Sequence, residues 1–103
     1  MINIIFLHGL LGTKNDWQKV IKNLPHFNCI PLDLPFHGQA KGVEVTNFEE
    51  TAEYLSQQIK SAVKNEPYFL VGYSLGGRIA LYYALQAQVE RFNLQGVILE
   101  GAN

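Results

Sequence analysis

Apolar residues along the chain fall into short continuous runs separated by stretches with helical spacing. Residues 2–7 form one such run, broken only by Asn3, and similar runs lie at 28–32, 68–71 and 95–100. Continuous runs of β-type residues are typical of strands that are buried on both faces. We therefore predict four strands at these positions.

Between the strands, apolar residues recur at intervals of three and four, which is the spacing of one helix face. Thr13 can cap the start of the first helix, and Pro25 ends it. "TNFE" has the spacing of a capping box at the start of the second helix, with Thr46 as the cap and Glu49 reaching back. The first helical face comprises Trp17, Val20, Ile21 and Leu24, and the second comprises Ala52, Leu55, Ile59, Ala62 and Val63.

A third helix is predicted from about Leu75 to Gln88, which completes the order βαβαβαβ. Strands that alternate with helices form a parallel sheet covered by helices, with right-handed connections. The predicted fold class is therefore α/β, with about four parallel strands flanked by helices on both faces.

Composition limits the size and the partners of this fold. A chain of 103 residues is enough for one small domain. Charged residues make up 17% of the chain, below the roughly 25% that is usual for soluble domains. We therefore expect either elements that are buried on both faces or apolar surface that contacts something outside this chain. The net charge of −1 gives no electrostatic reason to expect nucleic acid or an anionic membrane as a partner.

Two features bear on the compartment. Cys29 is the only cysteine, so the chain cannot form an internal disulfide, and we expect a reducing, cytoplasmic location with Cys29 as a small core residue. The opening "MINIIFL" is short and has no basic region before it. We interpret it as a buried strand and not as a signal peptide or a membrane span.

The string "GYSLG", residues 72–76, is G-x-S-x-G between a predicted strand and a predicted helix, which is the context of a nucleophile elbow. The turn is too tight for side chains on either side, so Gly72 and Gly76 make room while the Ser74 hydroxyl is exposed. The unpaired N–H groups of the following helix lie beside it and can stabilise negative charge. The alternative is a glycine-rich helix entry whose serine only caps the helix.

Two further loops follow strands and should face the same crevice as Ser74. "FLHGLLG", residues 6–12, is a His-Gly loop of the kind that supplies the second N–H of an oxyanion hole. "DLPFHGQA", residues 33–40, follows the second strand. Ligands of open α/β sheets bind at such a crevice, outside the carboxyl ends of the strands. The chain has neither of the glycine-rich motifs that bind nucleotide phosphates.

The strings "LHGLLGTKNDW", "DLPFHG" and "VGYSLGGR" resemble the α/β-hydrolase superfamily and, within it, the 2-succinyl-6-hydroxy-2,4-cyclohexadiene-1-carboxylate synthases of menaquinone biosynthesis. The Asp16-Trp17 pair and "GYSLGGR" separate this family from generic esterases, and the terminal "LEGAN" is also similar to it. The resemblance implies that residues 1–103 are the N-terminal part of a single hydrolase domain. It also implies that strand 28–32 lies outside strand 2–7, with 68–72 and then 95–100 on the other side.

Roles follow from the resemblance, residue by residue. Ser74 matches the nucleophile, and the backbone N–H groups of Leu10 and Leu75 match the oxyanion hole. Arg78 matches an arginine that binds substrate carboxylates, and the alternative is a solvated helix arginine. Tyr73 either lines the pocket or only packs against neighbouring residues. The implied reaction eliminates pyruvate from a small carboxylate, 2-succinyl-5-enolpyruvyl-6-hydroxy-3-cyclohexene-1-carboxylate, and it needs no metal or organic cofactor.

The histidines do not match a catalytic base, because the triad order of this superfamily is serine, acid and then histidine. His8 is expected to orient the oxyanion loop, His37 to shape its turn with Gly38, and Asp33 to hold loop backbone. The residues assigned to the structure of the loops are His8, Gly9, Gly72 and Gly76. Two positions depart from the family pattern, Phe36 in place of glycine and Ala40 in place of serine.

The chain carries the nucleophile but not its partners. No histidine follows Ser74, and the only later acids are Glu90 and Glu100. A serine hydroxyl is a weak nucleophile without an adjacent base, so we expect the chain alone to be inactive. Three interpretations remain: the N-terminal part of the lyase, a piece of a generic serine esterase, or a non-catalytic remnant. In the third case strand 95–100 is an uncovered edge, which predicts self-association or poor solubility of the isolated chain.

Overall fold

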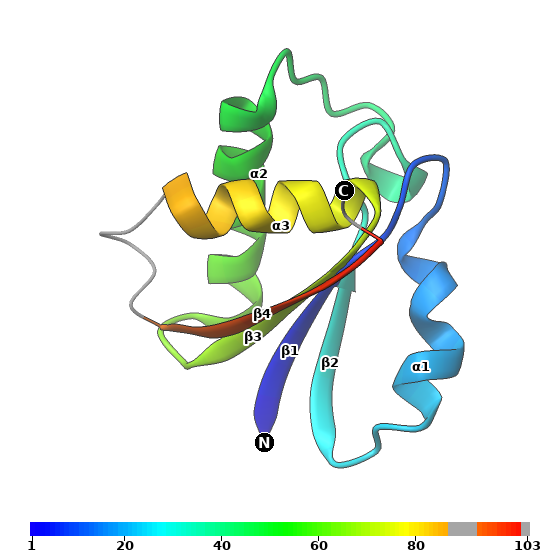
Figure 1. The fold of residues 1–103 in the computed structure, drawn as a ribbon, viewed down its shortest axis with the longest axis vertical. Coiled ribbons are helices and arrows are strands. Elements are labelled where there is room, and N and C mark those ends of the chain that lie inside the picture. The colour runs from blue at the N-terminus through cyan, green and yellow to red at the C-terminus, as the bar shows by residue number, and fades with distance from the viewer. Residues whose placement is uncertain (87–92, 102–103) are drawn as a thin grey trace.

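A parallel four-stranded sheet forms the centre of the molecule in the computed structural model, which describes residues 1–86 and 93–101 (Figure 1). The strand order is β2-β1-β3-β4, as expected from the resemblance. Each strand begins within one residue of its predicted start. The strands are β1 (Ile2–Leu7), β2 (Phe27–Leu32), β3 (Tyr68–Tyr73) and β4 (Leu94–Glu100).

The order of the strands reverses between β1 and β3. From β1 the chain goes out to β2 on one side and then returns to β3 on the other. Leu7 is paired with both Leu32 and Gly72. The loops that follow these three strands therefore begin at the same level, at the edge where α/β sheets bind ligands.

Helices α2 (Phe48–Val63) and α3 (Leu75–Gln86) lie on one face of the sheet (Figure 1). The main core lies between them and the sheet. Its fully buried members come from all of these elements, so the core joins β1, β3 and both helices into one unit. These members are Ile5, Leu7, Leu34, Leu55, Leu70 and Ala80.

The other face of the sheet is covered less completely. The 3₁₀ helix η1 (Lys14–Trp17) contacts β1 and β2, and its Trp17 ring packs on buried Phe6 with 5.0 Å between ring centroids. On β4, by contrast, Ile98 is 59% exposed. The prediction that both faces are covered therefore holds for β1 and β2 but not for β4 within the described residues.

The first predicted helix is shorter and less buried than expected. Thr13 caps it as predicted, but the backbone forms η1 and then α1 (Gln18–Lys22), which ends before Pro25. Val20 is 43% exposed because the tighter 3₁₀ turn changes the phase of the side chains. The prediction of one continuous helix up to Pro25 was therefore wrong, although Trp17, Ile21 and Leu24 of its predicted face are partly buried.

The second helix begins one residue later than predicted, so the prediction of Thr46 as cap was wrong. The Asn47 side chain accepts a hydrogen bond from the Glu50 N–H at 2.8 Å, and Glu50, not Glu49, reaches back to the Thr46 N–H at 2.9 Å. The buried face moves accordingly. Ala62 is exposed, and Thr51 is buried with its hydroxyl donating to the Asn47 carbonyl.

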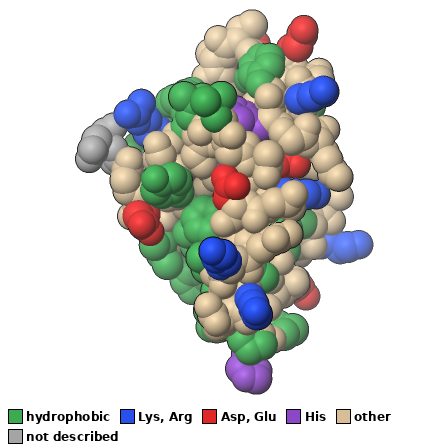
Figure 2. Space-filling model, turned by 90° about the vertical axis from the view of Figure 1, so that its right-hand side faces the viewer, with side chains coloured by type: hydrophobic (Ala, Val, Ile, Leu, Met, Phe, Trp, Pro, Cys, Tyr) green, Lys and Arg blue, Asp and Glu red, His purple; other side chains and the backbone are tan. Residues whose placement is uncertain are grey.

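The remaining elements complete the fold. A short 3₁₀ turn, η2 (Gly38–Ala40), lies in the loop after β2. The predicted end of α3 at Gln88 lies outside the described residues. Among the described helices, none is both long and apolar enough to cross a membrane. On the face shown in Figure 2, positive and negative side chains are interspersed and neither sign forms a patch.

Candidate active site

Ser74 lies at the sharp turn between β3 and α3, in a backbone conformation that side chains rarely adopt. Its φ is 55°, in the left-handed region. Its N–H donates to the Glu100 carbonyl at 2.8 Å, and its carbonyl accepts from the Arg78 N–H at 3.1 Å. The end of β4 and the first turn of α3 thus hold the residue from both sides. Strained residues of this kind are concentrated at functional sites.

The glycines around Ser74 are required by close backbone approach. A Cβ at Gly72 would collide with the Gly76 carbonyl, and a Cβ at Gly76 would collide with the carbonyls of Leu7 and His8. The first turn of α3 therefore sits directly on the end of β1. This contact brings the serine next to the loop that follows β1.

The two N–H groups assigned to an oxyanion hole come from these neighbouring segments. Leu75 is the first residue of α3, where N–H groups have no partner within the helix. Leu10 follows Gly9, and a Cβ at Gly9 would lie 3.5 Å from the Ser74 Cβ. The loop is therefore adjacent to the serine, and the use of these N–H groups stays a prediction.

His8 is 1% exposed and joins the loops after β1 and β2. Its Nε2 accepts from the Leu34 N–H at 3.0 Å, and its Nδ1 lies 2.8 Å from the Gly9 carbonyl. Burial lowers the pKa of His8 below its usual value. The ring is therefore neutral near pH 7, and its Nε2, 3.9 Å from an Asp33 carboxylate oxygen, forms no ion pair with it.

His37 makes the opposite connection, from the second loop to the first. Its Nε2 accepts from the Leu11 N–H at 3.0 Å, and its Nδ1 lies 2.9 Å from the Pro35 carbonyl. All four ring nitrogens of His8 and His37 thus bind backbone groups. Neither ring has a nitrogen left to act as a base toward Ser74.

Asp33 fixes the second loop. Its carboxylate accepts from the Lys14 N–H at 2.8 Å and the Gln39 N–H at 2.9 Å, and it packs so closely on Gly38 that a Cβ there would collide with it. Burial alone would raise the pKa of Asp33, but these hydrogen bonds and the nearby Lys14 and His8 lower it overall. The carboxylate is therefore charged and holds backbone.

Arg78 and Tyr73 flank the serine. Arg78 is exposed on α3, one turn after Ser74, and its N–H donates to the Ser74 carbonyl at 3.1 Å. The Tyr73 ring lies against Gly9 and is half exposed. Both residues are exposed, and their contact with substrate stays a prediction.

An apolar cavity of about 390 Å³ adjoins the candidate oxyanion hole. It lies between the loops after β1 and β2 and the starts of α2 and α3. Sequence reasoning identified the lining residues in the two loops and Leu75 of the G-x-S-x-G string, but it missed Val45, Phe48, Thr51 and Ile79, which lie far along the chain from those motifs. The lining residues are Leu10, Leu11, Leu34, Pro35, Phe36, His37, Val45, Phe48, Thr51, Leu75 and Ile79.

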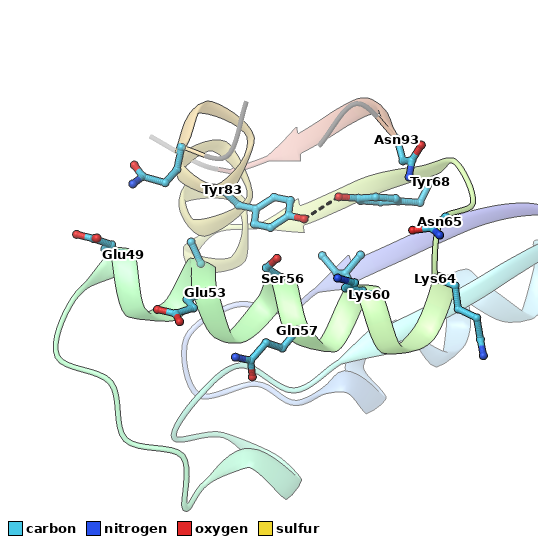
Figure 3. A pocket seen from close by; sticks show the side chains of 13 residues that line it. Glu49, Glu53, Ser56, Gln57, Lys60, Lys64, Asn65, Tyr68, Tyr83 and Asn93 are labelled. Atoms are coloured by element: carbon cyan, nitrogen blue, oxygen red, sulfur yellow. Dashed lines mark hydrogen bonds between the residues drawn. The ribbon is translucent and has the colours of Figure 1, made fainter. Parts of the chain in front are cut away.

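A larger hollow, of about 630 Å³, lies between α2 and α3 (Figure 3). The hydroxyls of Tyr68 and Tyr83 are 2.7 Å apart in its wall, and Asn93 lies near its end. Tyr68 begins β3 and Asn93 precedes β4, so this hollow lies at the amino ends of the strands, away from Ser74. Among the described residues, no cluster of His, Cys, Asp and Glu could hold a metal ion.

Comparison with known proteins identifies relatives of the whole chain. The family model described as "alpha/beta hydrolase fold" matches residues 2–102. A Haemophilus influenzae protein named "Putative 2-succinyl-6-hydroxy-2,4-cyclohexadiene-1-carboxylate synthase" is 90% identical over 103 residues, which are 100% of this chain and 42% of that protein. The Serratia proteamaculans 2-succinyl-6-hydroxy-2,4-cyclohexadiene-1-carboxylate synthase is 43% identical over 97% of this chain and 38% of its own length.

Solved structures show the same arrangement. MenH from S. aureus is 32% identical, with a TM-score of 0.83 over 99% of this chain and 38% of that one. A marine microorganism esterase is 25% identical, with a TM-score of 0.83 over 95% of this chain and 36% of that one. The chain thus spans about two fifths of the length of the curated relatives it matches.

Proposed function

The chain belongs to the alpha/beta hydrolase fold family, and from that premise we propose that it forms the nucleophile-bearing N-terminal part of a 2-succinyl-6-hydroxy-2,4-cyclohexadiene-1-carboxylate synthase. One observation carries this proposal: the 90% identity, across all 103 residues, with the H. influenzae protein of that name. The strained serine between β3 and α3 supports it, because a cap residue needs no left-handed backbone.

The proposed reaction is the elimination of pyruvate from 2-succinyl-5-enolpyruvyl-6-hydroxy-3-cyclohexene-1-carboxylate. A base removes a proton from the ring, a second ring double bond forms, and the bond between the ring carbon and the enolpyruvyl oxygen breaks. The released enolpyruvate takes up a proton at its methylene carbon and becomes pyruvate. Ser74, paired with a histidine, acts as that base. The N–H groups of Leu10 and Leu75 stabilise the negative charge that develops. Arg78 binds a substrate carboxylate, for which a guanidinium is a good bidentate partner.

The histidine that activates Ser74 comes from outside this chain. No histidine follows Ser74, and His8 and His37 use both ring nitrogens on backbone. A serine without an adjacent base is a weak nucleophile or base. The 103 residues alone are therefore expected to release no pyruvate.

A generic serine esterase is the second candidate. The structural match to an esterase, with a TM-score of 0.83, supports this candidate at the level of the fold. Fold does not determine chemistry, however, and Arg78 one turn behind Ser74 favours a carboxylate substrate. The two candidates differ in whether the enzyme releases pyruvate or hydrolyses simple esters.

The test joins this chain to the part of the H. influenzae relative that the chain does not cover. We expect this joined protein to release pyruvate, and Ser74→Ala to lower the rate by at least about 100-fold, because a positioned acid–base group contributes that much. Ser56→Ala on α2 is the matched control and should keep full activity. Pyruvate release that survives Ser74→Ala would contradict the proposal. Hydrolysis of p-nitrophenyl acetate without pyruvate release would favour the esterase.

A further inference from the structure

The two loops beside Ser74 are joined by a pair of reciprocal hydrogen bonds. His8, in the first loop, accepts from the Leu34 N–H of the second, and His37, in the second loop, accepts from the Leu11 N–H of the first. The two rings lie next to each other, with 4.9 Å between their centroids. We call these two histidines with their four backbone partners the histidine clasp, those partners being Gly9, Leu11, Leu34 and Pro35.

We propose that His8 and His37 are positioning residues that together set the direction of the Leu10 N–H, and that they do so only while both rings are neutral with the proton on Nδ1. The proposal goes beyond a structural role for His8 alone. It rests on the proposed function in one respect, the use of the Leu10 N–H in an oxyanion hole.

The first half of the clasp acts through the peptide group between Gly9 and Leu10. The Gly9 carbonyl accepts from the His8 Nδ1–H at 2.8 Å and from the Gly12 N–H at 3.0 Å. In a planar trans peptide the C=O and the N–H point in opposite directions, and the described chain has no cis peptide. Two donors that fix the Gly9 carbonyl therefore also fix the direction of the Leu10 N–H.

The second half acts on the next peptide group, between Leu10 and Leu11. The Leu11 N–H donates to His37 Nε2, and Leu11 has a φ of 64°. A leucine is unfavourable in the left-handed region, so a specific contact must hold it there. His37 supplies that contact, and it thereby keeps the loop in the turn that presents Leu10.

The tautomer of each ring follows from its partners. In both rings Nε2 faces a backbone N–H and must be the acceptor, and Nδ1 faces a carbonyl and must be the donor. A protonated imidazole has donors at both positions. In that state Nε2–H would face another N–H, so the bond to Leu34 or to Leu11 would be lost.

Several charged groups surround the clasp. The Asp33 carboxylate, 3.9 Å from His8 Nε2, and Asp16 favour a positive charge on His8, whereas His37 opposes it. The Lys14 ammonium binds the Gln39 side chain beside the second loop. His8 is almost fully buried, whereas His37 is only partly buried.

Nuclear magnetic resonance tests the clasp directly. Imidazole ¹⁵N spectra of the chain at pH 7.5 should show the Nδ1–H tautomer for both His8 and His37, with exposed His26 as the internal reference. As the pH falls, the Leu10 and Leu11 amide signals should move together with the His37 ring signals. A ring found as the Nε2–H tautomer, or amide signals that ignore the titration, would overturn the proposal.

Two variants separate the hydrogen bond from the charge. His37→Phe removes the acceptor, so the Leu11 amide should exchange with solvent at least about 10-fold faster. His37→Gln keeps an acceptor that does not titrate, so it should restore slow exchange and abolish the pH-dependent shift of Leu10. Slow exchange at Leu11 in His37→Phe would count against the clasp.

In the joined protein, His37→Phe should lower kcat by roughly 10- to 100-fold with little change in KM, because a misaimed donor weakens the transition state only. His37→Gln should recover kcat. Failure of the clasp and failure of the proposed function remain distinguishable. Wrong tautomers overturn the clasp whatever the activity, and correct tautomers in a protein that releases no pyruvate overturn the proposed function only.

Discussion

At the scale of single residues, the candidate site depends on residues that the surrounding structure holds in unfavourable backbone conformations or in shifted protonation states. Ser74 is the clearest case, because its φ of 55° suits a glycine better than a serine. A serine stands at this position instead of a glycine because the proposed reaction needs its hydroxyl. Strain at this residue is balanced by its two backbone hydrogen bonds, to Glu100 and Arg78.

Replacement of Ser74 should reveal this strain. We expect Ser74→Gly to be more stable toward unfolding than Ser74→Ala, by about 1 kcal/mol, since only glycine adopts a left-handed backbone without a Cβ penalty. Urea denaturation of both variants measures the difference. Equal stability of the two variants would mean that the backbone at Ser74 is not strained.

Two buried titratable groups at the site predict the pH dependence of stability. The pKa of His8 is lowered from 6.5, chiefly by burial, so below about pH 6.5 the unfolded chain binds a proton that the folded chain resists. The pKa of Asp33 is lowered from 3.8, so its contribution is present above that pH and is lost as the pH falls further. Stability should therefore decrease on acidification, first below 6.5 and again below 3.8.

Urea denaturation between pH 8 and pH 5 measures the loss of unfolding free energy that is due to His8. For one proton this loss is at most about 1.4 kcal/mol per pH unit. His8→Gln should flatten the curve in this range. His26→Gln, which removes an exposed imidazole, is the matched control. A native protein whose stability rises from pH 7 to pH 5 would contradict the neutral state of His8.

At the scale of elements, local sequence signals predicted the starts of the strands to within one residue but not the cap of α2. The start of α2 illustrates the limit. Thr46 and Asn47 are adjacent and both are good caps, and each has a glutamate three residues later, Glu49 or Glu50. The choice of Asn47 is made by the burial of Thr51 against the core, which no local pattern contains.

Alanine substitution distinguishes the two caps. Asn47→Ala should cost about 1 kcal/mol of unfolding free energy, because the Glu50 N–H loses its acceptor. Thr46→Ala should cost less than half as much, since it removes only an exposed hydroxyl bond to Glu50 and leaves the backbone bond. Thermal or urea denaturation of the two variants provides the comparison, and a larger loss for Thr46→Ala would reverse the assignment.

At the scale of the whole molecule, the four apolar runs predicted the strands, and the resemblance to the α/β-hydrolase superfamily predicted their order. The G-x-S-x-G string predicted the turn between β3 and α3 where Ser74 lies. The histidine clasp was not accessible, because each of its cross-links joins residues 26 apart whose partners are backbone groups. The apolar cavity was missed for a similar reason, since Phe48 and Ile79 meet only through the packing of α2 and α3.

Exposed apolar residues on the edge strand predict how the isolated chain behaves. No strand pairs beyond β4 within the described residues, and Ile98 and Leu99 are exposed on it. We propose that the 103-residue chain self-associates through this strand, as unprotected edges do. Light scattering at micromolar concentration should give a mass above the 11.6 kDa of one chain.

Ile98→Lys should reduce this association, because a charge on an edge strand opposes pairing with another chain. Leu85→Lys, at an exposed apolar position on α3, is the matched control and should leave it unchanged. A monodisperse monomer for the unaltered chain would contradict the proposal.

The hydrogen bond from the Ser74 N–H to the Glu100 carbonyl also sets an order of events during synthesis. The serine and the carbonyl that anchors it are 26 residues apart (100 − 74). At about 5–20 residues per second, the ribosome adds that carbonyl roughly one to five seconds after the serine. For that interval the nascent chain already carries both glycines and the hydroxyl, yet the strained turn has no anchor on the β4 side. The turn at Ser74 therefore gains its second anchor only when β4 joins the sheet, so a chain released in that interval would carry the G-x-S-x-G motif without the backbone bond that holds it.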